Sequence, residues 1–327
     1  MNTKLQEMLG IEFPVILAHM FLASNVEMII AATAAGITGC MPAHNFRTIE
    51  ELRAGLEKMK NEAKGPIGIN LIVHQSNVQY KEQLKACLDY EIDYFITSLG
   101  KPDEVIQKAH EKNIKVFCDV IDHDYAKKVI DMGCDALIAV NNGAGGHLGK
   151  IPASVLVPML KKNFKTPVIS AGGVNTGSGI LSILALGADG LSIGSPFIAT
   201  KECLVSKEYK QACIDYGAAD IAVTTKLSGT PCTVIKTPYV KKIGTEQNFL
   251  ESYLNKNKQL KKYAKMLTFY KGMNLLEKAA FSATYKNVWC AGSSIEFTKK
   301  EETIAEVVRR LKVECEAAQN ILNEKLS

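Results

Sequence analysis

The hydrophobic positions of the chain form short runs rich in β-branched residues, and these runs alternate with longer segments of helical period. Such runs are typical of parallel strands buried on both faces, and the segments between them of crossover helices. We count eight runs, at residues 13–18, 37–41, 67–73, 94–99, 115–120, 136–140, 167–171 and 190–193. Eight successive βα units predict an α/β fold with a closed TIM (β/α)8 barrel, in preference to an open doubly wound sheet.

Helix boundaries can be read between these runs. Ser24 with Glu27, and Thr48 with Glu51, have the spacing of a capping box, which predicts a helix start at each Ser or Thr. Residues 132–138 and 186–192 share one order: the end of a helix, a glycine, a small residue, an aspartate and an apolar strand. This faint internal repeat supports the count of βα units.

The pattern changes after the eighth run. Residues 239–284 are rich in Lys, Asn and Leu, with helical period and no strand signal, and a final helix is predicted over residues 301–325. We therefore predict a barrel domain formed by residues 1–238 and 285–327, with residues 239–284 inserted as a mainly helical cap.

Composition and charge narrow the class of protein. The chain has 327 residues, of which 47% are hydrophobic and 22% charged, which is typical of a globular protein. The net charge of +5 is too small and diffuse for a dedicated nucleic-acid-binding protein. The densest basic run has the spacing of a solvated helix face, which we favour over a docking patch for an acidic partner; it comprises Lys256, Lys258, Lys261, Lys262 and Lys265.

The cysteines and the N-terminal segment bear on location. Nine cysteines without a CxxC pair predict free thiols and a reducing compartment. No signal peptide is recognisable at the N-terminus, and the most apolar stretch, residues 15–41, is interrupted by polar residues and glycines. We expect a cytoplasmic protein without a membrane span.

Histidines gather where the active sites of such barrels lie, at or just after the strand ends: His19, His44, His74, His123 and His147. Each of them, taken alone, is more often a structural hydrogen-bonding residue than a catalytic one. The usual metal-binding spacings of His and Cys are absent, and the polar residues after the fifth run form only a loose cluster, so we expect no metal site.

The loop at residues 141–150 places four glycines around His147. It matches neither a Walker A loop nor the dinucleotide-binding GxGxxG pattern. The glycines predict a backbone that comes close to a flat ligand while the His147 imidazole projects over that ligand. The alternative is a flexible loop with an incidental histidine.

The next two loops carry the features of a phosphate site. Gly172 and Gly173 follow Ser170 at the end of the seventh run, while Gly194 and Ser195 open a further helix after the eighth. In TIM barrels these two loops and the N-terminus of a short extra helix commonly bind phosphate through backbone N–H groups. A mononucleotide anchored there would extend across the barrel mouth toward Asn70 and His147.

These residues resemble the nitronate monooxygenase (2-nitropropane dioxygenase) family, which includes the FMN-dependent enoyl-ACP reductases of type II and NAD(P)H:quinone reductases. The resemblance covers nearly the whole chain. It is carried by Pro14-Val15 with Met20, Gly68-Ile69-Asn70, Ala144-Gly145-Gly146-His147, Ala171-Gly172-Gly173-Val174, residues 186–190 through Gly194-Ser195, and Ala291-Gly292.

The resemblance implies FMN as cofactor and His147 as the catalytic histidine. The FMN contacts that it implies are Ala18, His19, Met20, Asn70, Lys115, Ala144, Gly145, Gly172, Gly173, Gly194 and Ser195, to which we add Ser170 from the seventh strand. This chain departs from the family where acidic residues are common, at Val140 and Gly143, and where Gln is common, at Ser293. Ser195 stands where Thr is common and keeps the hydroxyl.

Several functions remain open on the sequence alone. The first is a nitronate monooxygenase that oxidises alkyl nitronates with O₂. The second is a reductase that passes hydride from NAD(P)H through FMN to a quinone or an enoyl thioester. The others are a flavin-free barrel isomerase or lyase that uses Asp119, and a catalytically silent flavin-binding protein. The partner is in each case a small molecule, and the sequence leaves the oligomeric state open, a dimer included.

Overall fold

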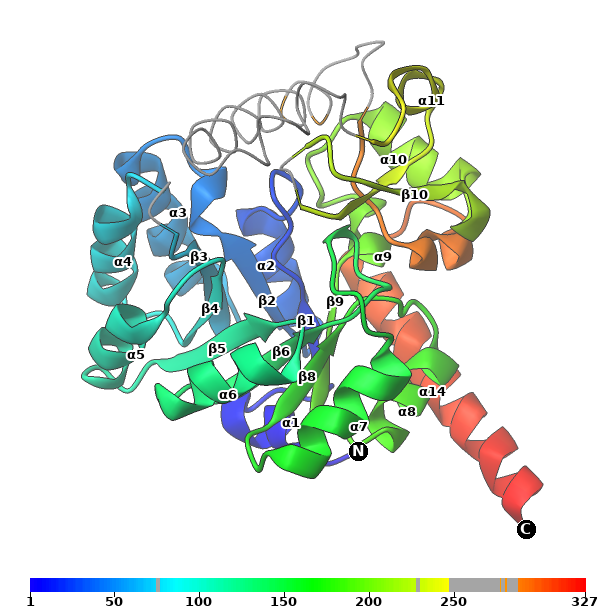
Figure 1. Cartoon of the computed structure of the whole chain (residues 1–327), viewed down its shortest axis with the longest axis horizontal. Coiled ribbons are helices and arrows are strands. Elements are labelled where there is room, and N and C mark those ends of the chain that lie inside the picture. The colour runs from blue at the N-terminus through cyan, green and yellow to red at the C-terminus, as the bar shows by residue number, and fades with distance from the viewer. Residues whose placement is uncertain (75–76, 228–229, 247–276, 278–279, 281–287) are drawn as a thin grey trace.

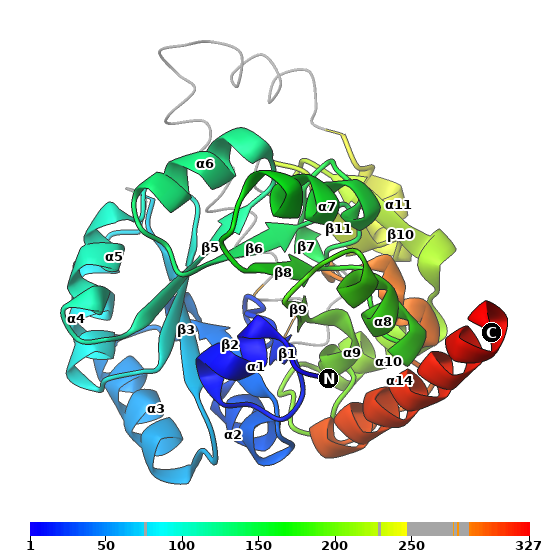
Figure 2. The ribbon, with the colours of Figure 1, turned by 90° about the horizontal axis from the view of Figure 1, so that it is seen from below.

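The computed structural model of the chain describes residues 1–327 except 75–76, 228–229, 247–276, 278–279 and 281–287. Eight parallel strands close into a barrel in the order β1-β2-β3-β4-β5-β6-β8-β9, as Figure 2 shows from below. The predicted barrel is therefore confirmed. Its strands are β1 (Val15–Leu17), β2 (Thr38–Pro42), β3 (Ile67–Ile72), β4 (Tyr94–Ser98), β5 (Lys115–Val120), β6 (Ala136–Val140), β8 (Val168–Ala171) and β9 (Gly190–Ile193).

The barrel interior is packed with side chains. Tyr94 and Phe117 stack at its centre with their ring centroids 5.1 Å apart, in a cluster with Ile16, Ile96 and other inward-facing residues. Leu5 of α1 (Lys4–Leu9) joins this cluster from the amino-terminal end of the strands, so α1 closes the floor of the barrel. Access to the barrel is therefore from the carboxyl ends of the strands.

Helices form the outer layer, with the chain crossing from strand to strand through them (Figure 1). The crossover helices are α2 (Val26–Ala34), α3 (Ile49–Glu62), α4 (Tyr80–Asp89), α5 (Asp103–His110), α6 (His123–Asp131), α7 (Ala153–Asn163) and α8 (Gly177–Ala185), with the 3₁₀ turn η1 (Ala43–Asn45) after β2. Beyond β9 lie α9 (Ser195–Ile198), α10 (Lys207–Asp215), η2 (Ala218–Asp220), η3 (Ser293–Phe297) and α14 (Ile304–Leu326).

The repeated glycine and aspartate of the sequence set strand register at the barrel floor. Gly133 and Gly187 follow helices with φ of +96° and +97°, a left-handed conformation that glycine adopts without strain. Two residues later, Asp135 Oδ2 accepts the backbone N–H of Val116 at 2.7 Å, and Asp189 Oδ2 that of Val168 at 2.8 Å. The repeat thus joins the start of one strand to the start of the preceding strand.

One predicted helix start is confirmed and one is wrong. Thr48 Oγ1 accepts the backbone N–H of Glu51 at 3.1 Å, at the start of α3. At α2 the cap is Asn25, whose Oδ1 accepts the N–H of Met28 at 3.0 Å. Ser24 instead bonds backward, because its hydroxyl accepts the N–H of Met20 at 3.0 Å and so fixes the loop after β1.

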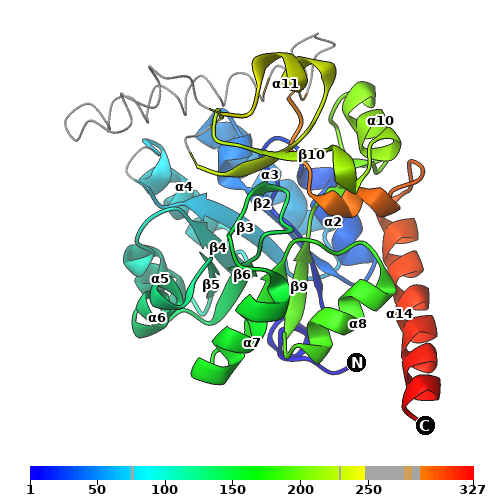
Figure 3. The ribbon, with the colours of Figure 1, turned by 45° about the vertical axis from the view of Figure 1, so that its right-hand side comes forward.

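A second, smaller sheet lies over the carboxyl end of the barrel (Figure 3). Its strands are β7 (Gly146–His147), β11 (Cys232–Ile235) and β10 (Ile221–Thr224), paired antiparallel in the order β10-β11-β7. Helix α11 (Pro238–Ile243) follows β11. Most of the segment predicted as a helical cap, including its basic run, lies outside the described residues, so the cap stays a prediction.

The last helix is slightly shorter than its predicted range, residues 301–325, and packs along the barrel. Thr303 caps helix α14, because its Oγ1 accepts the N–H of Glu306 at 3.2 Å, and the apolar side of the helix is buried through Cys315. It runs beside α8 and α2 (Figure 2). No helix in the described part of the chain is long and apolar enough to cross a lipid bilayer.

Candidate active site

Polar side chains from neighbouring strands meet inside the barrel mouth. Asn70 of β3 is buried, and its amide donates to Ser98 Oγ at 2.8 Å and to the backbone oxygen of Ile96 at 3.0 Å. The Ser98 hydroxyl, at the end of β4, donates to Asp119 Oδ2 of β5. His19, just beyond β1, lies with Nε2 3.3 Å from the same carboxylate oxygen. The mouth is thus lined by one connected polar group.

The next two strands continue this lining. Asn141 follows β6, is buried, and donates from Nδ2 to the backbone oxygen of Gly172 at 3.1 Å and to Ser170 Oγ at 3.4 Å. Asn141 Oδ1 accepts the N–H of Gly143 at 2.7 Å. One side chain therefore ties the loop after β6 to the loop after β8.

Glycines let these loops approach closely. A Cβ built on Gly172, where φ is +106°, would lie 2.4 Å from both the N and the Cα of Ala144. A Cβ on Gly145 would lie 2.9 Å from Ser195 Oγ and from the N of Gly292. The sequence predicted that the glycines make room for a ligand; at Gly172 and Gly145 they make room for neighbouring backbone.

Ser195 and the late Ala291-Gly292 segment complete this arrangement. The Ser195 hydroxyl, at the start of α9, accepts the N–H of Gly292 at 2.9 Å, and Ser195 is buried. Gly194 lies against the loop after β1, because a Cβ on it would be 3.2 Å from Met20 Sδ and 3.5 Å from Ala18 Cβ. Residues far apart in sequence therefore meet at the carboxyl ends of β1, β6, β8 and β9.

His147 lies on the small sheet above these loops. It pairs with Cys232 across the β7–β11 ladder, and Thr233 Oγ1 donates to the backbone oxygen of Ala144 at 2.9 Å. Desolvation lowers the pKa of the His147 imidazole, although the residue keeps exposed surface. A neutral imidazole at neutral pH can accept a proton.

Lys115, which was predicted to contact FMN, lies far from this site. It is the first residue of β5 and pairs with Tyr94, the first residue of β4, so it lies at the amino-terminal end of the barrel. There it lines a hollow together with Met8 and Asp93. Parallel strands bring only their carboxyl ends to the mouth, so the prediction for Lys115 is wrong.

The other histidines divide between the mouth and the outer layer. His44 lies in η1, where burial lowers its pKa, and its ring centroid is 6.0 Å from that of Phe21. His123 begins α6, and its ring stacks on Phe164 with the centroids 5.0 Å apart. His123 is thus part of the helical layer. Among the described residues, no three His, Cys, Asp or Glu side chains are grouped to hold a metal ion.

Sequence reasoning did not single out Ser98 and Asn141 as site residues. Each stands at the carboxyl end of an apolar strand, β4 or β6, and each bonds side chains or backbone from a neighbouring strand. The signal that could have found them is a polar residue directly ending an apolar run, where a barrel places its active site.

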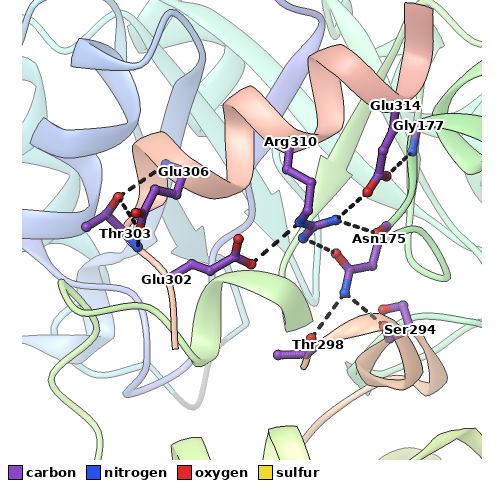
Figure 4. Close-up of polar contacts among 9 residues, drawn as sticks. All are labelled: Asn175, Gly177, Ser294, Thr298, Glu302, Thr303, Glu306, Arg310 and Glu314. Carbon is purple, nitrogen blue, oxygen red and sulfur yellow. Dashed lines mark hydrogen bonds and ion pairs between the residues drawn. The ribbon is translucent and has the colours of Figure 1, made fainter. Parts of the chain in front are cut away.

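The loop after β8 is also held from behind by α14 (Figure 4). Arg310 donates from Nη2 to Asn175 Oδ1 at 3.1 Å and from Nη1 to the backbone oxygen of Asn175 at 3.3 Å. Buried Asn175 in turn donates to Thr298 Oγ1 and to the backbone oxygen of Ser294, both at 3.1 Å. The glycine turn is therefore fixed to the C-terminal helix and to η3.

Several known proteins are similar to this chain in sequence. The family model described as "Nitronate monooxygenase" matches residues 2–314. A carboxyl-CoA dehydrogenase of Rhodococcus jostii, named for the substrate (3aS,4S,5R,7aS)-5-hydroxy-7a-methyl-1-oxo-octahydro-1H-indene-4-carboxyl-CoA, is 28% identical over 73% of this chain and 67% of its own length. A "Probable nitronate monooxygenase" of Staphylococcus haemolyticus is 27% identical over 73% of this chain and 79% of its own.

Solved structures share the fold. FabK from Thermotoga maritima superposes with a TM-score of 0.87 at 23% identity, over 99% of each chain. Nitroalkane oxidase from Streptomyces ansochromogenes superposes with a TM-score of 0.78 at 20% identity, over 97% of this chain and 99% of that one. At these identities the likeness concerns the barrel and its added elements. With the family model covering almost its full length, the chain belongs to the nitronate monooxygenase family and is an oxidoreductase.

Proposed function

We propose that the protein is an FMN-dependent oxidoreductase that oxidises alkyl nitronates with O₂. The observation that carries the proposal is the interlocked set of loops after β6, β8 and β9, with the polar mouth beside it. In this proposal the backbone N–H groups of Gly172, Gly173, Gly194 and Ser195 receive the phosphate, because the loops after the seventh and eighth barrel strands, here β8 and β9, are the usual phosphate site of TIM barrels.

The residues of the mouth fit a flavin. Asp119 Oδ1 and His19 Nδ1 are buried without a hydrogen-bond partner among the described residues, so the mouth has polar capacity that a polar ligand would use. Asn70 lies among these groups, and Ala18 and Met20 adjoin Gly194. In this proposal Asn70 and the loop after β1 hold the ring, while Ala144 and Gly145 border it near Ser195.

The flavin, when bound, accepts the electrons that the substrate gives up. The protein's part is to hold the substrate above the ring and to exclude water. His147 takes the α-proton where the neutral nitroalkane is offered, since its lowered pKa keeps the imidazole neutral at neutral pH. With a nitronate, which has already lost that proton, His147 has no proton to remove.

Purified protein should therefore contain one FMN per chain, and it should consume oxygen on addition of ethyl nitronate without any nicotinamide. Oxygen uptake measured with an electrode, together with the visible absorption spectrum, tests both parts. A flavin-containing protein that takes up no oxygen would contradict the nitronate activity but leave the FMN site standing.

A second candidate is a reductase that transfers hydride from NAD(P)H through FMN to a quinone or to a thioester. The relative from Rhodococcus jostii favours it, because the name of that enzyme gives a coenzyme A thioester as substrate, and its sequence identity to this chain, 28%, is close to that of the staphylococcal relative. Anaerobic mixing with NADH or NADPH separates the candidates: bleaching of the flavin band indicates the reductase, and an unchanged band the monooxygenase.

The pH dependence of turnover should distinguish His147 as the base. With nitroethane, activity should rise with pH along a limb centred below pH 6.5, because desolvation lowers the His147 pKa and only the neutral ring accepts the proton. With ethyl nitronate the limb should be absent. In His147→Gln the nitroethane rate should fall about 100-fold or more, in line with the usual contribution of general base catalysis.

A limb centred above pH 6.5, or a His147→Gln enzyme that keeps its nitroethane rate, would rule out His147 as the base. Stopped-flow measurement of flavin absorbance under anaerobic conditions gives the rate of the first step without interference from the reaction with oxygen.

A further inference from the structure

The function proposed above gives two titratable side chains at the barrel mouth no role beyond that of polar lining. His19 Nε2 lies 3.3 Å from Asp119 Oδ2, and the side chains are 20% and 18% exposed. The pair therefore lies mostly within the protein and still reaches the mouth. It comes from opposite parts of the barrel, since His19 follows β1 and Asp119 belongs to β5.

The carboxylate of this pair is held in place from the side. The Ser98 hydroxyl donates to Asp119 Oδ2, and Ser98 Oγ accepts from the buried Asn70 amide at 2.8 Å. Ser98 Oγ accepts a hydrogen bond from Asn70 and donates its only proton to the carboxylate, so the Ser98 hydroxyl has no further proton to donate. Asp119 is thereby fixed as an acceptor that faces His19.

The pair has hydrogen-bonding capacity left over. Asp119 Oδ1 and His19 Nδ1 are shielded from solvent and have no hydrogen-bond partner among the described residues. A carboxylate only accepts hydrogen bonds, so it favours a ring proton on Nε2 and leaves Nδ1 without one in the neutral ring. When the ring gains a second proton, one N–H remains with Asp119 and the other becomes a donor for a ligand.

The neighbouring titratable groups do not compete for that proton. Cys40 of β2 and Tyr125 of α6 feel the Asp119 charge, but burial raises the pKa of both, and they stay neutral at neutral pH. His44 lies apart in η1, and its own pKa is lowered by burial. His74 follows β3 and His147 follows β6. The His19→Gln variant described below tests whether His19, and neither of these residues, takes up the proton.

We propose that His19 and Asp119 form an oxyanion-recognition pair that selects substrates bearing a nitronate, enolate or carboxylate group. The inference rests on the proposed function, because it concerns the substrate held at the same mouth. Binding of the anion draws one proton from water onto the imidazole. The resulting imidazolium is balanced by Asp119, donates a charge-assisted hydrogen bond to the ligand oxygen, and releases the proton to water when the anion leaves.

Propionate is a suitable probe, because it has the size and charge of ethyl nitronate and undergoes no oxidation. Titration calorimetry of the flavin-loaded protein with propionate, above pH 6.5 and in two buffers of different ionisation enthalpy, measures the protons taken up. We expect uptake of about one proton per site, the proton that the proposal places on His19 Nδ1. In His19→Gln and Asp119→Asn the uptake should vanish, and the dissociation constant for propionate should rise about tenfold.

A matched control is available on the outer surface. His110 Nε2 lies 3.0 Å from Asp135 Oδ2, the same pairing of residue types outside the mouth, so His110→Gln should leave both propionate affinity and proton uptake unchanged. Nitrogen NMR of the His19 ring adds a readout that a purely structural role would not move. Both ring nitrogens should shift to protonated values when propionate is added to the wild type, and in Asp119→Asn they should not.

Unchanged proton uptake in His19→Gln would overturn the proposal. So would His19 ring-nitrogen chemical shifts that stay the same when propionate is added to the wild type. Binding of propionate without proton uptake in the wild type would do the same. The flavin absorption of the same samples reports on the proposed function separately. A wild-type protein that holds flavin and consumes oxygen with ethyl nitronate, yet binds propionate without proton uptake, contradicts the recognition pair alone.

Discussion

Replacing Gly172 by alanine is expected to abolish FMN binding. The new Cβ would lie 2.4 Å from the backbone of Ala144, so the loops after β6 and β8 would have to separate, and the left-handed φ of +106° would be strained as well. We expect a loss of about 2–5 kcal/mol in the free energy of unfolding from strain and overpacking together. FMN affinity should fall more than about 100-fold, a change of at least 2.7 kcal/mol.

Gly187→Ala is the matched control for this variant. Gly187 has nearly the same φ, +97°, but the nearest atom to its Cβ would be Lys161 Cγ at 3.5 Å, and it lies at the end of α8 next to the barrel floor. This variant should show the strain, about 1–3 kcal/mol, and keep its FMN. Urea unfolding and fluorescence titration with FMN measure the two quantities. Equal FMN affinity in both variants would show that the contact of Gly172 with Ala144 is not needed.

Replacing Arg310 by methionine should both destabilise the protein and weaken FMN binding. Arg310 lies with Nε 3.5 Å from Glu302 Oε2 and bonds Asn175 on the loop after β8 (Figure 4). Its loss leaves the Asn175 oxygen and the 12%-exposed Glu302 carboxylate without this partner. We expect a cost of about 2–3 kcal/mol in unfolding free energy, and FMN binding about tenfold weaker because the glycine turn loses its support.

A cation paired with an exposed carboxylate, on the same helix, provides the comparison. Lys312 Nζ lies 3.2 Å from Glu12 Oε2, whose side chain is 77% exposed, so Lys312→Met should cost less than about 1 kcal/mol and leave FMN affinity unchanged. Chemical unfolding with and without FMN separates stability from binding. If Arg310→Met lost stability but bound FMN normally, Arg310 would support the fold without positioning the loop.

The barrel could be predicted from the sequence because its strands are short apolar runs that a single rule describes. The eight runs coincide with the eight strands, with small differences at the ends, and the helix over residues 301–325 corresponds to α14. The capping assignment at Ser24 failed because Ser24 and Asn25 are both good caps, and sequence alone does not tell which side chain turns toward the helix.

The site was predictable where a residue's place along its strand decides the outcome. Asn70, Ser170 and Gly172 stand late in or after their strands and reach the mouth, as that position implies. Lys115 opens its strand, and the same reasoning would have placed it at the floor. Lys115 was assigned to the FMN site from family resemblance, which does not show at which end of its strand a residue lies.

Other features depend on contacts that no sequence pattern contains. Arg310 and Asn175 are far apart in the chain and meet only because α14 packs beside α8. The glycines of the loop after β6 were predictable as special, but their partners were not: Gly145 faces Ser195 and Gly292, which come from two other segments. The pairing of His19 with Asp119 likewise requires a closed barrel.

The aspartates at the barrel floor have a consequence for how such a protein can change. Asp93, Asp135 and Asp189 each accept a backbone N–H at the start of the preceding strand, from Ile67, Val116 and Val168, on the side opposite the proposed chemistry. Strand register is thus set at the amino-terminal end of the barrel, and the loops at the carboxyl end contribute little to it. Outside the interlocked glycines, mutations in these loops that change substrate preference therefore leave strand register intact, in keeping with relatives whose names are as different as nitronate monooxygenase and a carboxyl-CoA dehydrogenase.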